Sequence, residues 1–112
     1  MNGGDLVIVY ALYGSEDAAD DAARDAVESG LAACANRLAP CQSTYRWEGA
    51  VEQAAEIAVL FKTSASARDA LMARLAAGHD YDVPAILSWA VDAVHPPYLA
   101  WALAQVTAAR SG

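Results

Sequence analysis

The stretch from Val51 to Thr63 constrains the fold more than any other part of this 112-residue sequence. It follows Glu48-Gly49, a dipeptide typical of tight hairpin turns, and it contains the apolar run Ile57–Phe61. A strand over about residues 50–63 is roughly 46 Å long. A globular chain of this length has a diameter of only about 34 Å. We therefore expect the strand and its hairpin partner to extend beyond the domain and to be covered by another chain.

The rest of the sequence alternates between strand and helix patterns. Strands are expected at Leu6–Tyr13, at Leu31–Leu38 with a continuation at Cys41–Trp47, at Val51–Thr63 and at Ala85–Val91. Ala39-Pro40 should interrupt the second strand, because proline cannot donate to a central ladder. Helices are expected from a Ser15 cap to Gly30, from a Ser66 cap to Gly78, and from Pro96-Pro97 onward.

This order predicts an α+β fold of the ferredoxin-like, split βαβ type. Four antiparallel strands would form one sheet, with two helices on one face and a short C-terminal helix. No linker or repeat divides the chain, so we expect a single domain over residues 1–112 with a core at about 6–106. The C-terminal helix is apolar on two sides, which again favours an oligomer.

Charge and cysteine content exclude several functional classes. The net charge is −7 with a single lysine, Lys62, so a nucleic-acid or anionic-membrane partner is not expected. The segment Met1–Asp5 has neither the basic nor the apolar character of a secretory leader. Cys34 and Cys41 lack CxxC spacing, and we expect two reduced, buried thiols in a cytoplasmic protein.

Several motifs together resemble the CutA divalent-cation tolerance family. The resemblance covers about residues 6–106, and it is carried by Gly30–Cys34, Tyr45–Glu52, Glu56, Lys62-Thr63, His79–Ile86 and Tyr98–Trp101. It implies a heat-stable homotrimer whose long strands pair between subunits. The family is named for copper and divalent-cation tolerance, so the resemblance also implies a role of that kind. It implies no accepted reaction. Two positions depart from the family pattern: Asp80 replaces a proline, and Ala85 replaces a glutamate. If that glutamate contributes to a metal or ligand site in the family, the site is weakened in this chain.

Metal ligands are sparse in the sequence. The soft candidates are Cys34, Cys41, His79, His95, Met1 and Met72, and no two of them have HxxxH or CxxC spacing. His79 with Asp80 and Asp82 would hold a divalent ion weakly, or would be a loop histidine beside solvated acids. Cys34 lies in an alanine-rich strand, where a thiol is usually a small apolar residue. Copper or another divalent cation is therefore expected to bind weakly, at His79 before Cys34.

A ligand cleft is the other candidate site. Lys62 ends the most apolar strand, on the same strand face as Glu56. We expect both, with Trp47, Tyr81 and Pro84, to line an intersubunit cleft, because in one subunit the hairpin tip should lie far from the His79 loop. The alternatives are a Lys62 side chain that reaches into water, a Trp47 that packs the hairpin, and a Tyr81 that only holds its loop.

The sequence gives little support to catalysis. It contains no GxSxG, P-loop or GxGxxG motif, and a Cys34–His79 nucleophile pair would need a reactive mid-strand thiol. We expect no enzyme, but a CutA-like homotrimer associated with divalent cation (copper) tolerance or binding. Two alternatives stay open: a small-ligand-responsive regulatory trimer that resembles the PII signalling proteins in architecture, and a structural trimer that scaffolds a partner.

Overall fold

The computed structural model describes residues 5–107 of the chain. These residues form one antiparallel sheet and three helices, in an order close to that expected. The elements are β1 (Leu6–Tyr13), α1 (Glu16–Glu28), β2 (Cys34–Arg37), β3 (Cys41–Trp47), β4 (Ala50–Ser64), α2 (Arg68–Ala77), β5 (Ile86–Ala90) and α3 (Pro96–Gln105).

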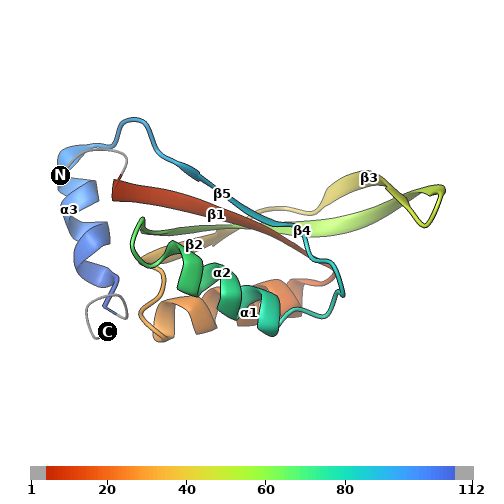
Figure 1. The fold of residues 1–112 in the computed structure, drawn as a ribbon, viewed down its shortest axis with the longest axis horizontal. Helices are drawn as coiled ribbons and strands as arrows, with labels where there is room; N and C mark the ends of the chain where they lie inside the picture. The colour runs from red at the N-terminus through yellow and green to blue at the C-terminus, as the bar shows by residue number, and fades with distance from the viewer. Residues whose placement is uncertain (1–4, 108–112) are drawn as a thin grey trace.

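Strand β1 lies inside the sheet, between β4 and β5, and both pairings are antiparallel. Its Val9 is opposite Phe61 of β4, and its Ile8 is opposite Trp89 of β5. Strands β2 and β3 pair with β4 one after the other along its second edge. The ferredoxin-like order is therefore present, and α1 and α2 cover the same face of the sheet (Figure 1).

The expected Leu31–Leu38 strand is wrong in its extent, whereas the expected interruption at Ala39-Pro40 is present and separates β2 from β3. The N–H groups of Leu31 and Ala32 both donate to the carbonyl oxygen of Ala26, so this segment completes the end of α1. Strand β2 thus begins only at Cys34. At the other end Pro40 has no N–H to donate, and the ladder stops before β3 resumes it.

Helix α1 begins and ends as the sequence predicts. The Ser15 hydroxyl accepts a hydrogen bond from the Ala18 N–H at 3.1 Å, and Gly30 has a φ of 78°, which suits a residue without a side chain. The expectation that Ser66 caps α2 is wrong. Ala67 is the N-cap residue and no side chain caps the helix, although the Ser64 hydroxyl accepts a hydrogen bond from the Ala67 N–H at 3.2 Å.

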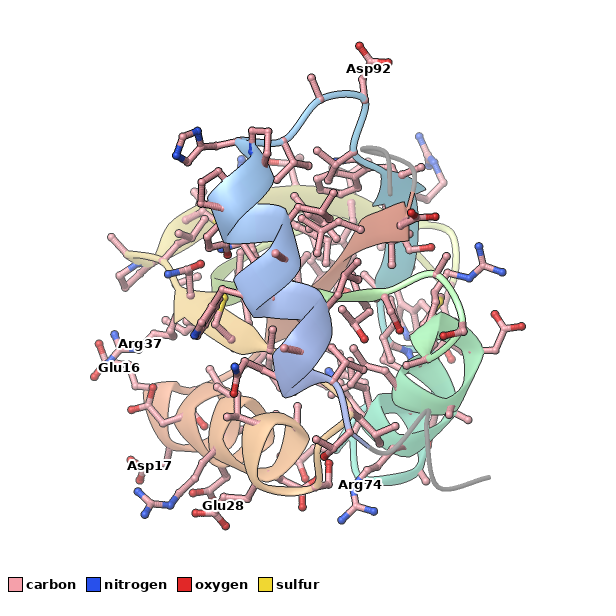
Figure 2. The ribbon with its side chains drawn as sticks, turned by 90° about the vertical axis from the view of Figure 1, so that its left-hand side faces the viewer. Glu16, Asp17, Glu28, Arg37, Arg74 and Asp92 are labelled. Carbon is pink, nitrogen blue, oxygen red and sulfur yellow. The ribbon has the colours of Figure 1, made fainter. Side chains whose placement is uncertain are left out.

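Two groups of ion pairs join the helices to their surroundings. Arg37 of β2 lies beside Glu16 of α1 (Figure 2), and it also donates to Asp20 at 2.9 Å. Arg74 of α2 donates two hydrogen bonds to the carboxylate of Asp25 on α1. All these groups are at least one-third exposed, so each pair contributes little to the stability of the fold.

The main core lies between the sheet and the helices α1 and α2. Val9, Val59, Phe61 and Leu71 have no exposed area there. A second cluster lies at the end of the sheet, where α3 stands across the start of β1 (Figure 1). It consists of Leu6, Ala33, Ala67, Leu99, Ala102 and Val106.

The β3–β4 hairpin extends beyond the helix layer, as expected (Figure 1). The molecule measures 45 × 26 × 22 Å, so its long axis is nearly twice its width. Glu48 and Gly49 both have positive φ, as tight hairpin turns require. Near the tip, Val51 is 61% exposed and Trp47 is 46% exposed. Residues 5–107 of one chain leave these apolar side chains uncovered.

The face of the sheet that α1 and α2 do not cover is largely apolar, although Lys62, opposite Ile8, also lies on it. Ile8 and Tyr10 of β1 point to this side, because the alternate residues Val9 and Ala11 point into the core. Their neighbours on β5 are Trp89 and Leu87, both nearly half exposed. We call this surface the open face; it is continuous with the hairpin.

Candidate functional site

A cleft lies between the β3–β4 hairpin and the loop that precedes β5. It encloses about 700 Å³ and is lined by Leu12, residues 43–47, Glu52, Glu56, residues 81–83 and Ala85. The expectation that hairpin and loop lie far apart within one subunit is wrong. Tyr13 pairs with Ile57, so β1 ends where the hairpin begins, and the Leu12 N–H donates to the Ala85 carbonyl at 3.3 Å. This register brings the two segments together in a single chain.

Glu56 and Tyr81 are the central polar pair of the cleft. The Tyr81 hydroxyl donates a hydrogen bond of 3.1 Å to Glu56 Oε2. Glu56 is only 7% exposed, and none of the ion pairs among the described residues includes it. Burial, together with the hydrogen bond to Glu56 and its charge, raises the pKa of Tyr81. Tyr81 therefore stays a hydroxyl donor at neutral pH.

The remaining lining is aromatic and mostly acidic. Tyr45 and Trp47 lie on one face of β3, and Tyr45 is opposite Glu52 of β4. Glu52, Glu56 and Asp82 supply three carboxylates, and Arg46 is the cationic residue of the lining, although its guanidinium donates to the Gly49 carbonyl at the turn. The cleft is thus an aromatic hollow with an excess of negative charge.

His79 holds the loop and does not line the cleft. Its Nε2–H donates to the Leu12 carbonyl at 2.7 Å, and its Nδ1 accepts from the Tyr81 N–H at 3.0 Å. The ring also stacks on Tyr13. Because both ring nitrogens are engaged within the chain, this geometry offers no free nitrogen to a metal. It favours the alternative in which His79 is a structural loop histidine.

Lys62 and Pro84 do not line this cleft, whereas Trp47, Glu56 and Tyr81 do. Lys62 follows Glu56 by six residues along β4, a distance of about 20 Å. Its ammonium group donates to the Asn36 side chain, and its partner in the ladder is Cys34. The structure therefore places Lys62 apart from Glu56.

The two cysteines are free, but they are not both buried. Cys34 is half-buried, with its Sγ 3.3 Å from the Tyr98 hydroxyl, while Cys41 is exposed. The hydrogen bond with Cys34, aided by burial, raises the pKa of Tyr98 to about 12. The expectation of two buried thiols is wrong for Cys41, because β3 belongs to the projecting hairpin.

The residues present do not form a metal site within one subunit. Across residues 5–107, no three side chains of histidine, cysteine, aspartate or glutamate cluster closely enough to hold an ion. Met1, another soft ligand in the sequence, lies outside the described residues. The sequence interpretation also missed Leu12, Tyr45 and Asp82 as lining residues; only the alternation of Tyr45 with Trp47 could have indicated one of them.

Comparison with known proteins places these features in a family. A family model described as "CutA1 divalent ion tolerance protein" matches residues 7–105. The chain belongs to the CutA divalent-cation tolerance family. It is 34% identical over 97 residues to a divalent-cation tolerance protein CutA of Pectobacterium atrosepticum, covering 87% of this chain and 88% of that protein. A CutA of Pyrococcus horikoshii is also 34% identical, covering 86% of this chain and 93% of its own length.

Solved CutA structures have the same fold. CutA from Xylella fastidiosa superposes with a TM-score of 0.88 at 33% identity, covering 91% of this chain and 98% of its own. CutA from Synechococcus elongatus gives 0.89 at 34% identity, covering 95% and 94%. The antiparallel sheet with three helices is therefore the CutA architecture.

Some CutA relatives are longer than this chain. A CutA homolog from Xenopus laevis is 35% identical over 98 residues. The alignment covers 88% of this chain and 65% of that relative. The chain spans about half the length of the mouse relative. The rice relative is named as chloroplastic, and a related CutA from Archaeoglobus fulgidus is described as periplasmic. No helix within residues 5–107 is long and apolar enough to cross a membrane.

Proposed function

We propose that this CutA protein acts as a homotrimer in divalent-cation tolerance and catalyses no reaction. The observation that carries the assembly is the open face, which is continuous with the exposed hairpin. Three copies follow from the family resemblance, in which long strands pair between subunits. The free cysteines suit a reducing compartment, and we propose a cytoplasmic location on that ground.

The open face has the composition of a protein–protein interface. Aromatic and large aliphatic residues dominate the buried centres of such interfaces, while charged residues are depleted there. Trp89, Leu87 and Tyr10 provide this centre. A contiguous exposed apolar surface of this kind is uncommon on a monomer.

Copper is the cation that we propose, and we propose that it binds weakly. Copper(II) forms the strongest complexes with nitrogen and oxygen ligands among the first-row divalent ions, and the chain has a net charge of −7. His79 would have to break its bonds to Leu12 and Tyr81 before binding, and Cys34 would have to leave Tyr98. Each neutral hydrogen bond lost costs about 1 kcal/mol, which reduces affinity severalfold.

Light scattering and copper titration test this proposal. We expect a particle of about three times 11.7 kDa at micromolar concentration, and a copper(II) affinity in the micromolar range or weaker. A stable folded monomer at that concentration would refute the assembly. Nanomolar copper binding by the wild type, lost in His79→Ala, would refute the weak site.

A second candidate function is favoured by the cleft at Glu56 and Tyr81. A concave, aromatic surface with a few convergent polar groups is the usual form of a small-molecule site. The protein would then be a ligand-responsive trimer, similar in architecture to the PII signalling proteins. The tight turn at Glu48-Gly49 leaves no long loop there, so the ligand would contact the hairpin strands themselves.

A further inference from the structure

We infer that the cleft between the β3–β4 hairpin and the loop before β5 binds an organic cation. The ligand class is a protonated amine with an apolar or aromatic body. The ammonium group would lie at Glu56 and the body would lie against Trp47 and Tyr45. This inference deepens the second candidate function and does not depend on copper binding.

The first support is that Glu56 has no cationic partner among the described residues. A carboxylate removed from water is costly unless a cation or several donors compensate it. Glu56 is buried, and the one hydrogen bond it accepts among the described residues is that of the neutral Tyr81 hydroxyl. The site therefore has room for one positive charge that the subunit itself does not provide.

Arg46, the cationic residue of the lining, is poorly placed to supply that charge. It is paired with Val51, five residues before Glu56 on β4, which is a separation of about 17 Å along the strand. An odd separation also places the two side chains on opposite faces of the hairpin. The Arg46 guanidinium instead donates to the Gly49 carbonyl at the turn.

The second support is the aromatic wall on the same face as Glu56. Tyr45 is opposite Glu52, which precedes Glu56 by four residues, so Tyr45 and Trp47 share the Glu56 side of the hairpin. Aromatic faces attract ammonium groups, and tryptophan does so most strongly. The cleft volume of about 700 Å³ lies within the range of small-molecule sites.

The third support is the fixed position of Tyr81. A Cβ atom at Gly14 would lie 2.8 Å from the Tyr81 hydroxyl, so the phenol occupies space that only glycine leaves free. His79 fixes the same loop through the Tyr81 N–H. The hydroxyl is thus held over Glu56 before a ligand arrives, which reduces the ordering cost of binding.

The test is a titration at pH 7 with three probes of similar shape: phenethylamine, 2-phenylethanol and 3-phenylpropanoate. Calorimetry measures affinity, and backbone amide NMR spectra locate the binding. We expect saturable binding of phenethylamine, at least tenfold tighter than the alcohol or the acid, with shifts centred on Glu56, Tyr81 and Trp47. Glu56→Gln should weaken amine binding at least tenfold.

Two variants act as controls. Glu28→Gln removes the same charge from an exposed site on α1 and should leave amine affinity unchanged. Trp47→Leu keeps every carboxylate and should weaken binding severalfold, which separates the aromatic contribution from the charge. Amide spectra of each variant confirm that it is folded before titration.

Three results would overturn the inference. These are no saturable amine binding, equal binding of amine and alcohol, or equal amine affinity in wild type and Glu56→Gln. If wild type fails to bind amine and Glu56→Gln dissociates the oligomer, the missing cation belongs to a neighbouring copy and the inference is wrong. Copper titration of the same samples reports separately on the metal proposal.

Discussion

The imidazole of His79 stacks on the phenol of Tyr13, with ring centroids 4.6 Å apart and planes 18° apart. Tyr13 ends β1, so the stack attaches the loop before β5 to the last residue of an internal strand. The Tyr13 hydroxyl is buried without a hydrogen-bond partner among the described residues, and burial raises its pKa to about 12. The stack and the two His79 hydrogen bonds together fix the loop that carries Tyr81.

Replacement of His79 should therefore reduce the stability of the protein. His79→Ala removes the stack and both hydrogen bonds, so we expect a loss of about 2–4 kcal/mol in unfolding free energy by urea denaturation. His79→Phe retains the stack and should lose less. Equal stability of wild type and His79→Ala would contradict the structural role of this residue.

Stability should depend on pH through Asp25 and Arg74. The hydrogen bonds from Arg74 lower the pKa of Asp25, and burial opposes this shift only in part. A carboxyl group whose pKa is lower in the folded state stabilises the protein at pH values above its unfolded pKa of about 4. This stabilisation is lost as the pH falls through the folded-state pKa. Arg74→Gln should therefore lower stability slightly at pH 7, since both groups are half exposed, and not at all in strong acid.

Urea denaturation at pH 7 and at about pH 2.5 measures this difference. Arg68→Gln is the matched control. Its partner Asp69 is the adjacent, highly exposed residue, so its loss should change stability little at either pH. A cost for Arg74→Gln that is equal at both pH values would contradict the assignment.

The exposed apolar residues of the open face should control assembly. Trp89→Glu places a charge in the centre of the open face and should convert the trimer to monomers in light scattering. Val27→Glu is the matched control, because Val27 on α1 is 42% exposed and Trp89 is 44% exposed. The control should remain trimeric. A trimeric Trp89→Glu would show that another surface joins the subunits.

The two thiols should differ in reactivity. Cys34 is half-buried against the Tyr98 hydroxyl, whereas Cys41 is exposed on the hairpin. A thiol reagent under native conditions should label Cys41 about tenfold faster or more, because access limits the reaction. Mass spectrometry of labelled peptides measures both rates. Faster labelling of Cys34 would contradict the observed burial.

Local sequence signals predicted most of the fold. The Ser15 cap, the Glu48-Gly49 turn and the two prolines that begin α3 each act within a few residues, and each is present. The start of β2 was not predictable in this way. It depends on Leu31 and Ala32 bonding back to Ala26, and no propensity distinguishes this from a strand.

The candidate site depended on long-range register, so it was predicted only in part. Trp47, Glu56 and Tyr81 come from the resemblance motifs and do line one cleft. Lys62 was grouped with Glu56 because both lie on one strand face, but six residues of strand separate them. The approach of loop and hairpin within one chain follows from Tyr13 pairing with Ile57, which a single sequence does not reveal.

The length of β4 gives the strand two regimes of backbone protection. Its second half, Ile57–Ser64, is hydrogen-bonded to β1 and covered by helices, so these amides should exchange with deuterium only through global unfolding. The first half, residues 50–55, is bonded to β3 alone. Its amides should exchange faster on dilution, because their protection depends on assembly and hence on protein concentration. One strand would then report both the folding of a subunit and its association.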